Sequence, residues 1–150
     1  MSKHSNDPFD LNRFLEAQKV IYLQALAELR AGQKESHWSW FIFPQVVGLG
    51  SSSMSVRYAI KSLEEAQAYL AHPVLGARLT ECVSTLNSLT GLSADQILGA
   101  VDAQKYRSCL TLFARAGIAD PAFGKALTKY FDGKPDGATL AILAKQQGAP

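Results

Sequence analysis

The sequence predicts an all-α fold, a single-domain bundle of about six or seven helices crossed by one long aromatic segment that is not helical. Apolar residues recur three and four positions apart along most of the chain, whereas the strict alternation typical of strands is missing. A chain of 150 residues is one domain by length and can bury a full core. We place the domain at residues 8–147, after a polar tail of residues 1–7 that we expect to be flexible.

The first helix is predicted over residues 10–31, with Asp7 or Asp10 as its cap and Gly32 as its stop. Residues 36–45, which we call the aromatic segment, contain both tryptophans, two phenylalanines and a histidine. This segment lacks helical periodicity and is followed by a glycine- and serine-rich stretch, residues 48–55, predicted as the long loop of the fold. Residues 41–43 and 56–60 are candidates for extended backbone.

The remaining helices are each predicted from a capping residue, an apolar stripe and a glycine or proline stop. They span residues 62–71, 73–91, 101–116, 121–131 and 136–144, with a short turn at residues 93–98. The N-terminal caps are Ser62, Ser93, Asp120 and Asp136, and Ser62 with Glu65 has the spacing of a capping box. His72 is expected to cap the carbonyl groups of the helix that precedes it.

Composition limits the classes of function. The net charge is +2, from 15 basic and 13 acidic residues without a run of either sign, so we expect neither a nucleic-acid partner nor a membrane partner. The polar N-terminus differs from a signal peptide, and Cys82 and Cys109 fall in helical patterns typical of buried thiols, so a reduced, cytoplasmic protein is predicted. Histidines and cysteines do not occur at ligand spacing, so no metal or cofactor is expected. The oligomeric state stays open.

Two features could carry chemistry. The aromatic segment has enough apolar area that it must be buried or line a pocket, and His37 within it is a proton donor, a stacked ligand contact or a hydrogen-bonded core group. Asp102, Lys105 and Ser108 are spaced three apart on one helix and therefore share a face. That face is either a solvated surface or a polar face directed inward, where Lys105 could hold an anionic oxygen or a carbonyl group.

Several motifs together carry a family resemblance. They are Ser36-His37-Trp38-x-Trp40-Phe41-x-Phe43-Pro44-Gln45, Gly48-Leu49-Gly50 with Ser52, Arg57-Tyr58-x-Ile60, Glu65-Ala66, Tyr69-Leu70-x-His72-Pro73-x-Leu75-Gly76-x-Arg78-Leu79 and Lys105-x-x-Ser108-x-x-Thr111-Leu112-Phe113. With these residues the chain resembles the bacterial domain-of-unknown-function family 1810, often mislabelled calpastatin, from about residue 7 to residue 143. That label conflicts with the composition, because a calpain inhibitor of that kind would be a disordered, charged repeat chain.

The family is distantly similar to the superfamily of YbiA-like and NADAR domains, and this resemblance implies a YbiA-like helical fold and N-glycosidic bond cleavage on a nucleotide-like or ADP-ribose-like molecule. Such a hydrolase needs a carboxylate, a proton donor and a stacking surface near the sugar. The carboxylate would be Asp102 or Glu35, the donor His37 or Lys105, and the stacking face Trp38 or Trp40. The other substrate-binding candidates are Gln45, Ser52, Arg57, Tyr58 and Ser108.

Two other interpretations stay open beside the hydrolase. The domain could be a non-catalytic module that binds a nucleotide or a partner protein through the same aromatic segment. It could instead use that segment as a structural plug in the bundle, with His37 and Gln45 satisfying buried backbone groups.

Overall fold

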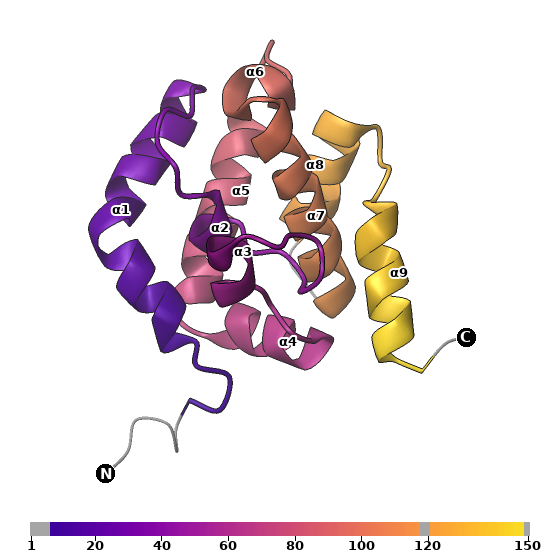
Figure 1. Ribbon diagram of the computed structural model, residues 1–150. Helices are drawn as coiled ribbons and strands as arrows, with labels where there is room; N and C mark the ends of the chain where they lie inside the picture. The colour runs from indigo at the N-terminus through magenta and orange to yellow at the C-terminus, as the bar shows by residue number, and fades with distance from the viewer. Residues whose placement is uncertain (1–6, 118–120, 149–150) are drawn as a thin grey trace.

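Helix α7 (Ala100–Ala116) runs through the middle of the fold, and other helices are arranged around it (Figure 1). The computed structural model describes residues 7–117 and 121–148, and these contain nine helices. The other eight are α1 (Asn12–Ala31), α2 (Ser39–Ile42), α3 (Ser53–Arg57), α4 (Leu63–Ala71), α5 (Leu75–Ser88), α6 (Ala94–Leu98), α8 (Ala122–Phe131) and α9 (Gly137–Gln146). Helix α7 contacts α2, α4, α6, α8 and α9, while α5 contacts α1, α4 and α8. The predicted all-α single-domain fold is confirmed.

Aromatic side chains fill the centre of the bundle. Tyr69 of α4 is fully buried and lies between Phe14 of α1, at 5.1 Å between ring centroids, and Phe113 of α7, at 5.3 Å. Phe43, which follows α2, packs on Tyr106 of α7 at 4.6 Å. Because these rings join α1, α4, α7 and the aromatic segment, the core fixes the position of that segment relative to α7.

Most of the helix ends are formed by the capping residues that the sequence predicts. The Asp7 carboxylate accepts hydrogen bonds from the backbone N–H groups of Leu11 and Asn12 at 2.7 and 2.9 Å, so Asp7 rather than Asp10 caps α1. Gly32 ends α1 with φ at +73°, the left-handed conformation that glycine adopts without strain. Ser93 and Asp136 cap α6 and α9 as predicted. The Asp120 cap lies outside the described residues.

Two predicted caps act differently from expectation. Ser62 caps α4 by accepting from the Glu65 N–H, but the Glu65 carboxylate forms an ion pair with Arg13 at 2.6 Å and accepts from the Lys61 N–H, so the capping box is not reciprocal. His72 was expected to cap the carbonyl groups of α4. Its Nδ1 instead accepts from the Val74 and Leu75 N–H groups, which puts it at the start of α5.

The aromatic segment and the loop after it hold more helix than predicted. Residues 39–42 form α2, so the segment expected to be non-helical contains one helical turn and residues 41–42 are not extended. Ser52 caps α3, so the predicted loop over residues 48–55 ends at residue 52 and residues 56–57 are helical. Strand-type pairing is limited, within the described residues, to one parallel bridge between Val46 and Ile60. These two short helices account for the difference from six or seven.

Within residues 7–117 and 121–148, each helix is too short or too polar to span a membrane.

Candidate functional site

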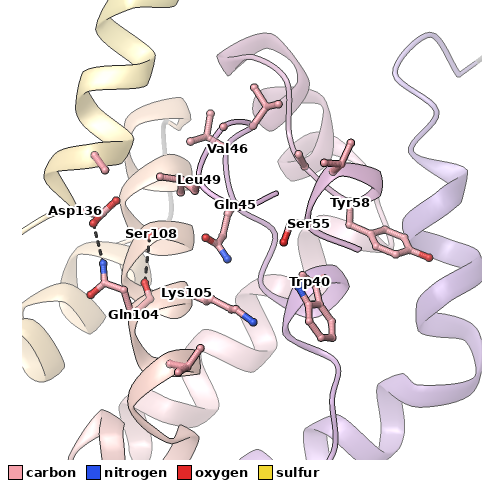
Figure 2. A pocket seen from close by; sticks show the side chains of 17 residues that line it. Trp40, Gln45, Val46, Leu49, Ser55, Tyr58, Gln104, Lys105, Ser108 and Asp136 are labelled. Carbon is pink, nitrogen blue, oxygen red and sulfur yellow. Dashed lines mark hydrogen bonds between the residues drawn. The ribbon is translucent and has the colours of Figure 1, made fainter. Parts of the chain in front are cut away.

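An open pocket of about 450 Å³ lies between α7, the start of α9 and the residues that follow the aromatic segment (Figure 2). We call residues 45–60 the pocket loop, because they form one wall. The opposite wall is the face of α7 that carries Val101, Gln104, Lys105 and Ser108, together with Asp136 and Ala138 at the start of α9. Trp40 of α2 closes one end. The pocket therefore sits where segments distant in sequence converge.

The two ends of the pocket loop are hydrogen-bonded to each other. In the parallel bridge, the Ile60 N–H donates to the Gln45 carbonyl at 2.8 Å and the Val47 N–H donates to the Ile60 carbonyl at 2.9 Å. From the outside, the Arg13 guanidinium donates to the carbonyl oxygens of Arg57 and Ala59, each at 2.8 Å. Because backbone bonds hold the loop to itself and the Arg13 side chain holds it to α1, this wall of the pocket is preorganised.

A second hollow of about 320 Å³, called the small hollow, adjoins the main pocket. Trp40, Val101 and Lys105 line both spaces, so these three side chains form the partition between them. The remaining residues of the small hollow are Lys34, His37, Ser39 and Asp102. Groups from the aromatic segment thus face the polar side of α7 across a solvent-reachable space.

The charged centre of this region is Asp102, which bridges two lysines. Its carboxylate lies 2.7 Å from Lys34 Nζ and 3.3 Å from Lys105 Nζ. Burial alone would raise the Asp102 pKa, but the two ammonium groups outweigh that desolvation and hold the pKa below its ordinary value. Asp102 is therefore an anion at neutral pH, and the three groups together carry one net positive charge.

The two ammonium groups also contact the two indole rings. Lys105 Nζ lies 4.4 Å from the centroid of the Trp40 ring, and Lys34 Nζ lies 4.8 Å from that of Trp38. An ammonium over an indole face is attracted by the ring quadrupole. Lys34 is the more deeply held, with 5% of its side chain exposed against 23% for Lys105. Lys105 is thus the more accessible of the two cations to a ligand.

Polar groups in the main pocket face its interior. Figure 2 shows the Gln45 amide and the Lys105 ammonium directed into the space between the pocket loop and α7. The Gln45 side chain makes no hydrogen bond to any other described residue, whereas Gln104 is occupied with Asp136 at 2.9 Å and Ser108 donates to the Gln104 carbonyl at 3.1 Å. The Ser108 oxygen keeps acceptor capacity. The pocket can therefore donate from Gln45 and Lys105 to the oxygens of a ligand.

Apolar side chains line the rest of the pocket and its rim. Val46, Val47 and Leu49 form the loop side. Val56 and Val101 stand at the mouth and are 58% and 71% exposed, unusually high for valine. The combination of an apolar mouth with a few polar groups inside is typical of sites for small organic molecules.

The two tryptophans of the aromatic segment have different environments. Trp38 is fully buried, and its Nε1 donates to the Glu28 carboxylate at 3.0 Å, so it belongs to the core. Trp40 is partly exposed and lines both spaces. Positions two apart on a helical turn point in different directions, and the turn α2 separates the two rings in this way.

The structure places the sequence-predicted site residues in three groups. Those that line one of the two spaces are Trp40, Gln45, Tyr58 and Ser108 in the main pocket, His37 and Asp102 in the small hollow, and Lys105 in both. Tyr58 contributes from the edge, because its ring packs on the partly buried ring of Phe41. Trp38 is core. Glu35, Ser52 and Arg57 are exposed residues that line neither space.

Sequence reasoning missed Lys34 and Gln104. Lys34 follows α1 and precedes the aromatic segment, and nothing in its neighbourhood in sequence indicates that it meets Asp102, 68 positions away. Gln104 could have been found, because it lies on the same helix as Lys105 and Ser108 and one turn before the latter.

The fold and site together define a small all-α domain with a preorganised pocket of mixed polarity. The model of the family described as "Protein of unknown function (DUF1810)" matches residues 8–143, so the chain belongs to that family. It is also similar to the conserved hypothetical protein Rv1873 from Mycobacterium tuberculosis, whose crystal structure is solved: the identity is 53%, 92% of this chain and 99% of that chain are covered, and the TM-score is 0.91. A search of curated proteins gives no match.

Proposed function

We propose that this protein binds a nucleotide-like small molecule in the main pocket, with Trp40 and Lys105 as its chief contacts. The observation that carries the proposal is the convergence of Trp40, Gln45 and Lys105 on one open space of about 450 Å³. Nucleotide-like molecules combine a flat ring with oxygen acceptors, and the pocket combines apolar and aromatic walls with amide and ammonium donors.

Cleavage of an N-glycosidic bond in the bound molecule is the second candidate function. The ionised Asp102 favours it, because an oxocarbenium-like transition state is stabilised by a nearby carboxylate. His37 and Lys105 line the same hollow as Asp102 and would be the proton donors. Binding takes precedence because the Asp102 charge is already offset by two lysines. We also propose a distant relation to YbiA-like and NADAR domains, which would favour the same substrate class.

The test is calorimetric titration of the purified protein with adenosine, AMP and ADP-ribose, followed by chromatography of the mixtures for free base. We expect saturable binding of at least one of the three, weakened by Lys105→Gln. The matched control is Lys19→Gln, which removes an exposed lysine from α1, outside both spaces. Release of free base would show that the protein hydrolyses the bound molecule rather than only binding it. Absence of binding by all three, in protein that unfolds cooperatively, would refute the proposal.

We also propose a cytoplasmic location. Cys82 and Cys109 are both free and buried, and burial raises the pKa of the Cys82 thiol to about 12. Unpaired thiols of this kind are usual in a reducing compartment.

A further inference from the structure

The geometry points to a phosphate subsite in the small hollow, where Lys105 and Lys34 would hold the phosphoryl group of a ligand whose flat ring lies in the main pocket. This inference rests on the proposed function for the identity of the whole ligand, but the subsite itself is argued from the small hollow alone. It places the phosphate beside His37, on the opposite side of Trp40 from the glycine-rich part of the pocket loop.

The small hollow carries an excess of positive charge. The titratable groups that line it are Lys34, His37, Asp102 and Lys105, and the carboxylate can neutralise only one of the two ammonium groups. Lys34 is nine-tenths buried, so its charge is poorly screened by water. An excess of positive charge among partly and fully buried groups that line a solvent-reachable space attracts an anion.

The small hollow offers several hydrogen-bond donors to an anion. Each ammonium group has three hydrogens. Lys34 uses one on the Ser36 carbonyl and one on Asp102, and Lys105 has Asp102 as its single polar partner among the described residues. Two hydrogens on Lys105 are thus available to a ligand in addition to those of the hydroxyl of Ser39 and the imidazole of His37. Lysine binds phosphate as a point charge. A phosphate group carries about −1.5 to −2 charge and three acceptor oxygens, so it can use more of these donors than a carboxylate with one charge.

The small hollow is connected to the main pocket. Because Lys105, Trp40 and Val101 line both spaces, a ligand can place its phosphate in the small hollow while its ring remains in the main pocket. The class of ligand is therefore a phosphomonoester of a flat, partly apolar molecule rather than the free nucleoside.

The closing experiment begins with inorganic phosphate, titrated at constant ionic strength while the NMR signals of the histidine rings and indole N–H groups are followed. We expect a saturable shift of the His37 and Trp40 signals with phosphate and a weaker one with acetate. His72, at the start of α5, is the internal control. Lys105→Gln should weaken phosphate binding roughly tenfold, as expected for loss of one charge-assisted partner. Lys19→Gln should leave it unchanged. Lack of saturation with phosphate, or equal binding of acetate, would overturn the subsite.

The second arm separates this inference from the proposed function. AMP should bind at least roughly tenfold tighter than adenosine, and the difference should shrink in Lys105→Gln. If adenosine and AMP bind equally and phosphate leaves His37 unmoved, the subsite is wrong and the proposed function stands. If phosphate saturates the His37 shift but adenosine, AMP and ADP-ribose all fail to bind, the subsite stands and the proposed function is wrong.

Discussion

Substitution of Glu28 by glutamine tests how the aromatic segment is held in place. Glu28 lies on α1, and its carboxylate accepts five hydrogen bonds. Oε1 accepts from the N–H groups of Glu35 and Ser36 at 2.8 and 2.9 Å and from Trp38 Nε1 at 3.0 Å. Oε2 accepts from Ser36 Oγ at 2.7 Å and from Gln24 Nε2 at 3.1 Å. A glutamine keeps the shape but presents an NH2 donor where two donors now converge.

The magnitude follows from the Glu28 pKa. Burial alone would raise it, but the hydrogen bonds from Glu35, Ser36 and Trp38 outweigh this and lower it from 4.5 to about 2. Glu28 is only 7% exposed, so solvent screening removes little of the effect. At 1.36 kcal/mol per pKa unit, the ionised carboxylate stabilises the fold by roughly 3 kcal/mol at neutral pH.

The pH dependence has a defined sign. The folded protein has the lower pKa, so the stabilisation is complete above the unfolded value of 4.5 and is lost as the pH falls towards 2. Linkage gives a loss of roughly 2 kcal/mol between pH 7 and pH 3. Glu28→Gln cannot titrate, so the difference in stability between wild type and variant should shrink by that amount over the same range.

The measurement is urea denaturation at pH 7 and pH 3, followed by tryptophan fluorescence. We expect Glu28→Gln to lower the free energy of unfolding by roughly 3 kcal/mol at pH 7. The control is Glu16→Gln, an exposed position on the same helix, which should change stability by less than about 0.5 kcal/mol. A cost for Glu28→Gln below about 1 kcal/mol, or one that is equal at both pH values, would refute the account of Glu28 as the anchor.

Two further predictions concern packing. Trp38→Ala should lower the free energy of unfolding, measured by chemical denaturation, by about 3 to 5 kcal/mol, because Trp38 is fully buried. Trp40→Ala should lower it less but abolish ligand binding, because Trp40 lines the pocket. Equal losses of stability in the two variants would contradict the division between core and pocket. Gly76→Ala should destabilise by at least about 1 to 3 kcal/mol, since its Cβ would lie 2.0 Å from the Leu70 carbonyl oxygen. The same change at Gly124, where a Cβ meets open space, should stabilise α8 by up to about 1 kcal/mol. Thermal denaturation measures both variants. If Gly76→Ala proved the more stable of the two, α4 and α5 would be able to move apart without cost.

The parts of the fold that could be predicted are those set by interactions within one helix. Apolar spacing located α1 and α7, and short-range caps such as Ser93 and Asp136 located helix starts to within a residue or two. Such signals are local, because the donor and acceptor lie within one turn. Glu65 shows where local logic stops: its spacing from Ser62 fits a capping box, but a buried arginine from α1 offers the stronger partner.

The candidate site could be predicted only in part, because its pairings are made between distant segments. Asp102 and Lys105 were found together since they share a helix face, while Lys34 reaches the same carboxylate from the end of α1. Without Lys34 the pair would be neutral, and the excess positive charge in the small hollow would not exist. The property that favours an anionic ligand is therefore one that the sequence does not display.

The aromatic segment shows how one turn of backbone decides function. Composition indicates that its indole rings must be buried or line a pocket, but both outcomes occur here, at positions only two apart. Because α2 turns the chain between them, Trp38 meets the Glu28 carboxylate inside the core and Trp40 meets the Lys105 ammonium at the partition between the two spaces. An extended segment would have put both rings on the same side. The single helical turn missed by periodicity thus separates a structural tryptophan from a ligand-facing one.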